Sequence, residues 1–398
     1  MEFNFSTKVK DLGGNAIREI FKLLAQPDMI SFAGGFPTIQ TLPVKLINEF
    51  LNEIMASPQA AQILQYGATE GYMPLRAAAI EYVKQFGIHG IDIPQTLIVS
   101  GGQQAIDLMC KAFLNKGDVV LVEDPTYLAV LHIIKTYEGR AIGVKSTQDG
   151  LDIEDLQSKI KRHKPKFLYV VPTFSNPTGK TYSAENRKKI AELTAKLGLP
   201  VLEDDPYSRI RFEGKEVPSL KSYDKTGNIV FVASFSKLIA PGLRTAICVG
   251  HEDILRKMTL GKQASDVHTG SLNQAVVCRF LQDGLLDKHI KTALPIYKEK
   301  KDAMIDGIKK YMPAQFSHTN PEGGLFIWGE IDKACNFDAA AEFANIAQTA
   351  KVAYVAGNNF FADSSGKNTL RLNYSNANLQ QIEQGLQKMG AYIKNLIS

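Results

Sequence analysis

The sequence has no long apolar run. No stretch approaches the roughly 18 apolar residues that a membrane-spanning helix needs. The first ten residues, Met1–Lys10, also lack an apolar core of signal-peptide length. These absences argue against a membrane partner and favour a cytoplasmic protein.

Cysteine and histidine are sparse as well. The seven histidines are dispersed without the spacing of metal ligands, so no metal site is predicted. The four cysteines show no CxxC spacing and lie in apolar or helical contexts, which predicts reduced, buried thiols in a cytosolic protein. These cysteines are Cys110, Cys248, Cys278 and Cys335.

Charge of one sign is not concentrated anywhere. The net charge of +5 is mild for 398 residues, and the lysines are dispersed. The densest groups, Lys159–Lys166 and Lys298–Lys301, alternate with apolar or acidic residues. We interpret both groups as solvated helix faces, and no nucleic-acid partner is predicted.

The chain is too long for one ordinary core. Its 44% hydrophobic and 22% charged residues are typical of a globular protein, and its length predicts two domains. From Thr96 onward, short β-rich runs alternate with amphipathic segments, which predicts an α/β fold with a mainly parallel sheet of seven strands between helices. The predicted strands are Leu97–Ser100, Val119–Val122, Ala141–Val144, Phe167–Val171, Val201–Glu203, Ile229–Ala233 and Ala246–Val249. The predicted helices between them lie near Gln104–Leu114, Leu128–Tyr137, Ile153–Lys161 and Ala184–Leu197.

The last part of the chain has a different pattern. The helical segment Leu285–Tyr311 is long enough to bridge two domains, and a smaller α+β unit follows it. We therefore predict an N-terminal segment of residues 1–45, packed with the small domain and over the active site, a large domain of residues 46–290, and a small domain of residues 291–398. The small domain has predicted strands at Leu325–Trp328, Val352–Val355 and Leu370–Asn373, and a closing helix at Leu379–Ile397.

One lysine follows a predicted buried strand. Lys237 comes after Ile229–Ala233, at the strand end where open α/β sheets bind ligands. Partial desolvation and the nearby Arg244 favour its free amine, the form that condenses with an aldehyde. Ser234, Ser236 and Arg244 are suited to holding a phosphate, and an aldehyde that carries a phosphate is pyridoxal 5′-phosphate. A solvated lysine in a surface turn is the alternative when this stretch is taken alone.

Polar or glycine residues follow the other predicted strands. Gly101 and Gly102 open a helix, and such an N-terminus makes a phosphate cradle, although a plain tight turn also explains them. Tyr127 offers a stacking face or simply a packed ring. Asn176 can donate to a phenolic oxygen, and Asp204 needs a cation if it is buried, such as a protonated pyridine nitrogen. Together with the lysine, these groups favour a cofactor site.

The order of these motifs resembles that of the fold-type I pyridoxal-phosphate-dependent aminotransferases. The resemblance covers nearly the whole chain. The segment Ile30–Pro37 (ISFAGGFP) and Gln65–Tyr66 are similar to a subgroup that includes 2-aminoadipate, kynurenine and bacterial multi-substrate aminotransferases. The motifs that carry the resemblance are Gly102–Gln103, Tyr127, Asn176–Gly179, Asp204 with Tyr207, Ser234–Lys237, Pro241–Gly242, Arg244 and Arg371.

The resemblance implies cofactor-binding roles. Lys237 would form the internal aldimine and shuttle a proton between Cα and C4′, with Asp204 paired to the pyridine nitrogen. Asn176 and Tyr207 would hold the phenolic oxygen, and Tyr127 would stack on the ring. The implied phosphate ligands are Gly102, Gln103, Ser234, Ser236 and Arg244, with Tyr66 reaching the cofactor of the neighbouring subunit in a homodimer.

Substrate roles are implied for a second set, Gly35, Asn176, Arg371 and Arg18. Arg371 lies in an apolar run, where it would clamp the substrate α-carboxylate or, alternatively, pair with a residue such as Glu330. Arg18 lies on the polar side of a predicted helix, Ala16–Ala25. It would either meet the distal carboxylate of an acidic substrate or remain a solvated neighbour of Glu19.

The expected reaction is transfer of an amino group from an amino acid to a 2-oxo acid by a ping-pong route, with 2-oxoglutarate as the expected acceptor. Donors of the 2-aminoadipate, aromatic or branched-chain type are expected. A lyase or decarboxylase with the same cofactor is the alternative, and a non-catalytic sensor fused behind a DNA-binding domain is a third reading, disfavoured by the short N-terminus.

Two departures from the family pattern leave this chemistry intact. Gly102 stands where many relatives have serine, and Leu325 stands where methionine is common. A cis peptide bond before Pro177 is also expected from the resemblance.

Overall fold

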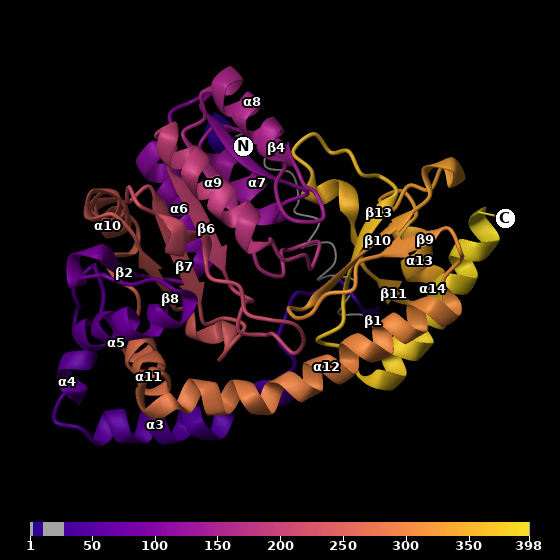
Figure 1. The fold of residues 1–398 in the computed structure, drawn as a ribbon. Coiled ribbons are helices and arrows are strands. Elements are labelled where there is room, and N and C mark those ends of the chain that lie inside the picture. The colour runs from indigo at the N-terminus through magenta and orange to yellow at the C-terminus, as the bar shows by residue number, and fades with distance from the viewer. Residues whose placement is uncertain (1–2, 11–27, 398) are drawn as a thin grey trace.

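The computed structural model describes residues 3–10 and 28–397, and its centre is a seven-stranded sheet of order β2-β8-β7-β6-β5-β3-β4 (Figure 1). The pairs β3–β4, β3–β5, β5–β6 and β6–β7 are parallel, whereas β8 runs antiparallel to both of its neighbours. All seven predicted strands are confirmed: β2 Thr96–Val99, β3 Val119–Asp124, β4 Arg140–Lys145, β5 Phe167–Val170, β6 Val201–Asp205, β7 Ile229–Ser234 and β8 Ala246–Val249.

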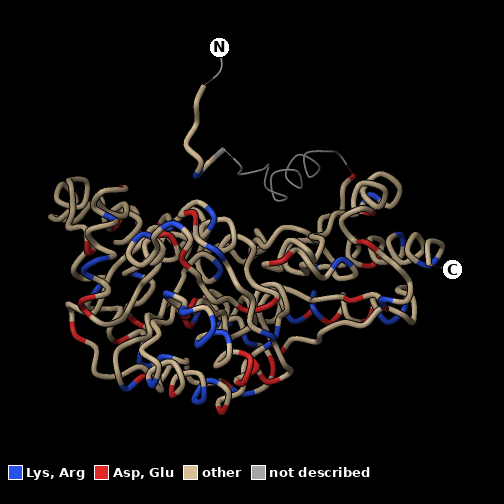
Figure 2. The backbone as a smooth tube through the Cα atoms, turned by 90° about the horizontal axis from the view of Figure 1, so that it is seen from above, with Lys and Arg blue, Asp and Glu red and all other residues tan. Residues whose placement is uncertain are grey.

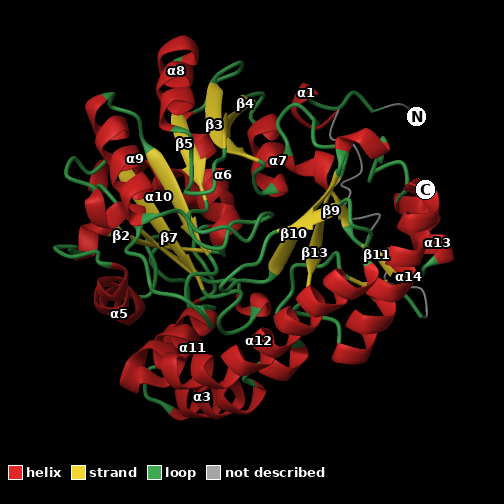
Figure 3. Cartoon of the chain, turned by 45° about the vertical axis from the view of Figure 1, so that its right-hand side comes forward, coloured by secondary structure: helices red, strands yellow, loops and turns green. Residues whose placement is uncertain are grey.

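Both faces of this sheet are covered by apolar side chains. In β3, Val119 and Leu121 face one apolar cluster, and Val120 and Val122 face another. Helices lie on the two sides of the sheet (Figure 3), which explains why its strands read as continuous apolar runs. These helices are α5 Met73–Val83, α6 Gly102–Phe113, α7 Leu128–Thr136, α8 Ile153–His163, α9 Ala184–Lys196, α10 Glu252–Asp266 and α11 Ser271–Leu281.

A second, smaller sheet has the order β12-β13-β10-β9 and is antiparallel. The register of β10 and β13 places Arg371 opposite Trp328. Near it, β1 (Ile30–Ser31) pairs with β11 (Val352–Ala353), so the N-terminal segment joins this half of the molecule. The remaining bounds are β9 Phe316–His318, β10 Phe326–Ile331, β12 Val355–Ala356, β13 Thr369–Asn373, α13 Phe343–Thr349 and α14 Leu379–Ile397.

The long helix α12, Leu285–Tyr311, runs beneath both sheets (Figure 1). Leu286 and Tyr297 belong to the core under the large sheet, whereas Met304 and Ile308 belong to the core of the small sheet. The predicted boundary at residue 290 falls inside α12 and stays a prediction. The helices before the large sheet are α1 Thr7–Lys10, α3 Val44–Ala56 and α4 Ala60–Ile63.

The interpretation of Lys298–Lys301 as a solvated face is wrong for two of its residues. Lys300 and Lys301 are 5% and 4% exposed. Lys300 donates to Thr38 Oγ1 and the Ser375 carbonyl, and Lys301 pairs with Asp302. Thr38 packs over Lys300, and Phe212 and Glu213 pack over Lys301, which the helical pattern of α12 itself does not reveal.

Charged residues of both signs are interspersed over the two halves of the molecule (Figure 2). Over residues 3–10 and 28–397, no helix is long and apolar enough to cross a bilayer. The four cysteines are unpaired; three are buried, and Cys335 is partly exposed.

Candidate active site

The residues predicted from the strand ends lie around one cavity of about 120 Å³. They meet because the parallel strands all present their carboxyl ends at one edge of the sheet. Since β8 runs the opposite way, its beginning lies at the same edge, and this brings Arg244 to the cavity. The predicted residues that line the cavity are Gly102, Gln103, Tyr127, Asn176, Asp204, Tyr207, Ser234, Ser236, Lys237 and Arg244.

Lys237 lies in the turn after β7. Burial, followed by the positive charges of Arg244 and Arg371, lowers the pKa of its amine to about 8. This confirms the expectation that desolvation and a second cation favour the neutral amine. Lys237 therefore supplies a nucleophilic nitrogen near neutral pH.

Asp204 lies in the last part of β6 and is 6% exposed. Its Oδ2 accepts a hydrogen bond of 2.9 Å from the Tyr169 hydroxyl, whereas its buried Oδ1 has no hydrogen-bond partner. Burial raises the pKa of this carboxyl to about 7, against the opposing effect of the Tyr169 hydrogen bond. A cation placed at Oδ1 would satisfy that atom and lower the pKa.

One end of the cavity has the donors of an anion site. Helix α6 begins at Gly102, so its first N–H groups point towards the cavity edge. Gly101 has φ 85°, and a Cβ there would lie 2.5 Å from Arg244 Nη2. Only glycine allows the backbone and this guanidinium to approach so closely. A Cβ at Gly102 would lie 3.2 Å from Asp204 Oδ1, so glycine leaves space beside that carboxylate.

Arg371 is a buried cation at the opposite side of the site. Its Nη1 donates to Asn176 Oδ1 at 2.8 Å and its Nη2 to the Ala33 carbonyl at 2.5 Å, while its Nε has no hydrogen-bond partner. Burial lowers the pKa of this guanidinium to about 10. Among the described residues, no carboxylate forms an ion pair with Arg371. Glu330, the alternative partner expected from the sequence, accepts a hydrogen bond from Asn368 instead. The arginine is therefore available to an anionic ligand.

Asn176 connects the two sides of the site. It accepts from Arg371 and is hydrogen-bonded to the Tyr207 hydroxyl, whose pKa burial raises. The Asn176–Pro177 peptide bond is cis, as predicted.

Two other predicted residues, Gly35 and Tyr66, do not line the cavity. Gly35 lies against Phe326, and a Cβ there would be 2.9 Å from Phe326 Cζ. Tyr66 is 82% exposed, and its ring centroid lies 5.9 Å from that of His268. Arg18 lies outside the described residues.

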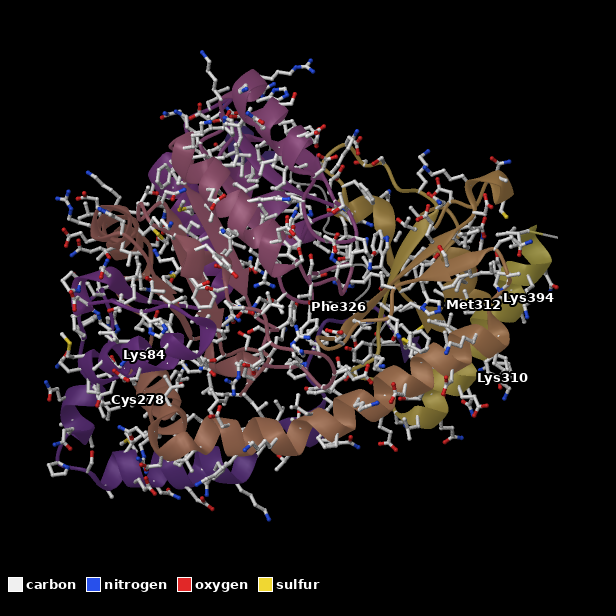
Figure 4. All side chains as sticks on the ribbon, in the orientation of Figure 1. Lys84, Cys278, Lys310, Met312, Phe326 and Lys394 are labelled. Atoms are coloured by element: carbon white, nitrogen blue, oxygen red, sulfur yellow. The ribbon has the colours of Figure 1, made fainter. Side chains whose placement is uncertain are left out.

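Three aromatic residues of the site were not predicted from the sequence. Tyr169 supports Asp204, and the rings of Phe326 and Phe360 lie 4.3 and 5.1 Å from the guanidinium carbon of Arg371. Figure 4 shows Phe326 between the two sheets. A signal existed for Tyr169, because a hydroxyl within the buried run Phe167–Val170 requires a hydrogen-bond partner. Nothing in the sequence indicates that Phe326 and Phe360 meet at one arginine.

These residues fit pyridoxal 5′-phosphate. Asp204 Oδ1 is a buried acceptor that needs a cation, a Cβ at Gly101 would clash with the Arg244 guanidinium, and Lys237 is an amine of lowered pKa. The fold and the site together define an enzyme that depends on this cofactor.

Comparison with known proteins identifies the family. Residues 28–389 match the model of the class I and II aminotransferases. Aromatic-amino-acid aminotransferase 1 of Thermococcus litoralis is 36% identical over 98% of this chain and 94% of its own length. The solved kynurenine aminotransferase of Pyrococcus horikoshii superposes with a TM-score of 0.93 at 38% identity, covering 98% of this chain and 97% of that one. The alpha-aminoadipate aminotransferase of Thermus thermophilus, solved with N-(5′-phosphopyridoxyl)-L-leucine, gives a TM-score of 0.90 at 34% identity, with 98% and 97% covered.

The chain belongs to the class I and II aminotransferase family. It is a pyridoxal-phosphate-dependent aminotransferase of fold type I.

The pKa of Lys237 predicts a pH profile for the apoenzyme. The rate at which it captures pyridoxal should rise with pH and level off above a midpoint of about 8, because only the neutral amine reacts. Arg244→Gln removes a neighbouring positive charge, so the pKa of Lys237 should rise and the profile should move to higher pH. Absorbance stopped-flow measures both profiles. A wild-type midpoint near the ordinary lysine value would contradict the lowered pKa.

Proposed function

We propose that this aminotransferase acts on amino acids with bulky aromatic or acidic side chains and that 2-oxoglutarate is the acceptor, in a ping-pong reaction. The arrangement of three groups supports the assignment of the reacting residues. Lys237 shares a cavity with the unpartnered Oδ1 of Asp204. Arg371 lies beside that cavity and has no carboxylate partner among the described residues. When bound, pyridoxal 5′-phosphate supplies the electron sink that makes a proton at the substrate Cα removable.

Each residue of the cavity has a proposed task toward the cofactor. Asp204 holds the proton on the pyridine nitrogen, and its buried Oδ1 and raised pKa support this role. Lys237 would hold the cofactor at its aldehyde carbon by a condensation that releases water, and its amine would carry the proton at the substrate Cα. Asn176 and Tyr207 hold the phenolic oxygen, and Tyr127 packs on the ring. The phosphate ligands are Gly102, Gln103, Ser234, Ser236 and Arg244.

The substrate α-carboxylate is proposed to bind Arg371. The free Nε and the flat guanidinium between two aromatic rings are suited to a two-point contact with a carboxylate. Asn176 orients Arg371 through its Oδ1, and Gly35, which packs against Phe326, stays a proposed substrate contact.

The proposed substrate classes follow those of the similar proteins. These act on aromatic amino acids, kynurenine or alpha-aminoadipate. Arg18 stays the proposed contact for a distal carboxylate.

We further propose a homodimer with composite sites in the cytoplasm. Tyr66 is 82% exposed and lies outside the cavity of its own subunit, which supports a contact with the phosphate bound by a partner. Leu64 and Met73, which are 62% and 54% exposed, add apolar surface close to it in the sequence. The unpaired cysteines support a reducing compartment.

Lys237→Ala tests the reaction. Each amino acid is mixed with the cofactor-loaded enzyme, and the loss of cofactor absorbance reports the half-reaction. The variant should lose nearly all turnover yet still bind the cofactor, because Lys237 supplies the proton transfer but only part of the affinity. Lys257→Ala, which changes an exposed lysine of α10, is the control. More than a few per cent of wild-type turnover in Lys237→Ala would contradict the mechanism, and products other than a 2-oxo acid would indicate a lyase or decarboxylase.

Arg371→Gln should lower kcat/KM for both the amino acid and the 2-oxo acid, since both lose a charge-assisted contact. The loss should correspond to about 3 kcal/mol of transition-state stabilisation. Arg371→Lys should lose less, because it keeps the charge but not the planar fork. Steady-state kinetics with a primary amine that lacks a carboxylate provide the comparison. An equal loss for that amine would show that Arg371 does not recognise the carboxylate.

Sedimentation velocity at the assay concentration should show a dimer. Tyr66→Ala should weaken cofactor binding, because one hydroxyl contact to the phosphate is lost. The dimer itself should not dissociate. A fully active monomer would exclude the composite site.

A further inference from the structure

An ion pair between a buried lysine and a partly exposed aspartate lies behind the phosphate end of the cavity. Lys262 and Asp266 are one turn apart on α10, and Lys262 is 0% exposed. Lys262 Nζ donates to Asp266 Oδ1 and Oδ2 at 2.8 and 2.9 Å, and to Gln104 Oε1 of α6 at 2.8 Å. Gln104 Nε2 in turn donates to Asp266 Oδ2 at 2.8 Å. None of these three residues lines the cavity itself.

The three side chains converge on Ser100. Its N–H donates to Gln104 Oε1 at 2.7 Å, and its hydroxyl donates to Asp266 Oδ2 at 3.0 Å. Its carbonyl accepts from Arg244 Nη2 at 3.1 Å. Every polar group of Ser100 is therefore held, and Ser100 immediately precedes the glycine turn that opens α6.

The chain after α10 is bent towards the same residue. Val267 has φ 65° and ψ −62°, a rare and strained γ-turn conformation that is unusual for a β-branched residue. The bend brings Thr269 Oγ1 to 3.0 Å from Ser100 Oγ, and Gln274 Nε2 donates to the Thr269 carbonyl at 2.6 Å. Surrounding contacts must hold such strain in place, and here they converge on Ser100.

Stability alone does not explain this cluster. The free-energy cost of removing a lysine from water is about as large as the attraction it gains in an ion pair, so such pairs often add no net stability. Their geometric effect is larger, because a charge that is bonded on several sides has one permitted position. In this chain, that position determines where Ser100, and through it the guanidinium of Arg244 and the first N–H groups of α6, can lie.

We propose that Lys262, Asp266 and Gln104 are positioning residues that hold Ser100, and thereby the α6 N-terminus and Arg244, in the geometry that binds the phosphate of the cofactor. This proposal rests on the phosphate site proposed above and assigns a role to residues that do not contact the cofactor.

The test compares pyridoxal 5′-phosphate with pyridoxal, which lacks the phosphate. Affinities of both for the apoenzyme are measured by absorbance titration in a buffer free of phosphate. Lys262→Met should lower the affinity for pyridoxal 5′-phosphate by about tenfold or more, which is the usual effect of losing a partner that orients ligand-binding groups. The affinity for pyridoxal should stay unchanged. Asp266→Asn keeps one acceptor oxygen but removes the negative charge. The loss of affinity in this variant should therefore be smaller, and it should again be confined to the phosphorylated ligand.

Lys300→Met is the matched control. Lys300 is also a buried lysine of a long helix, but its partners are Thr38 and Ser375, outside the cavity. It should lower the unfolding temperature without changing the ratio of the two affinities. Circular dichroism reports whether Lys262→Met folds. If Lys262→Met does not fold, the affinities of Asp266→Asn decide whether the cluster positions the phosphate-binding groups.

Two results would overturn the proposal. Equal losses for both ligands in the Lys262 and Asp266 variants would show that the cluster only supports the fold, and unchanged affinities would show that it is dispensable. Arg244→Gln separates this failure from that of the phosphate site. If Arg244→Gln loses the preference for the phosphorylated ligand while the cluster variants keep it, the proposed phosphate site stands and only the positioning role falls. If the wild type itself has no preference, both fall.

Discussion

Desolvation of charged groups at one edge of the large sheet is the constraint on which the rest of the structure depends. Asp204 is buried with one oxygen unpartnered, Lys237 lies near two other cations, and Arg371 is buried with no carboxylate partner in the described part of the chain. An isolated buried charge is expensive, so such groups persist only where a ligand or cofactor completes them. The described residues leave these three groups without complete partners, which is the basis for proposing that pyridoxal 5′-phosphate and a substrate carboxylate bind them.

The topology of the sheet explains how these groups meet. Parallel strands deliver Tyr127, Asn176 and Lys237 to one edge, as in other open α/β sheets. The single reversed strand β8 adds a residue that precedes a strand, Arg244, to the same edge. Arg371 comes from the second sheet and is tied to the first by its bond to Asn176. A movement of the small sheet relative to the large one would therefore change the carboxylate site and leave the phosphate end unchanged.

The groups behind the site are as ordered as those that line it. Tyr169 orients Asp204, and the cluster of Lys262, Asp266 and Gln104 surrounds Ser100. In both places a buried hydrogen-bonded group has one permitted position, which is how a protein keeps ligand-binding atoms in place without contacting the ligand.

Several features were determined by the sequence alone. Apolar runs of strand length set the seven strands, and polar or glycine residues directly after them, with Lys237 the most informative, placed the cofactor site. These signals are local, since a strand and the residue that follows it are adjacent in the chain. Only the tertiary structure decided the rest: that Lys300 and Lys301 are covered, that β1 pairs with β11, that Phe326 and Phe360 flank Arg371, and that Lys262 lies behind Ser100. These contacts join residues far apart in the chain, and burial of a polar side chain depends on which distant segment packs over it, which no local pattern encodes.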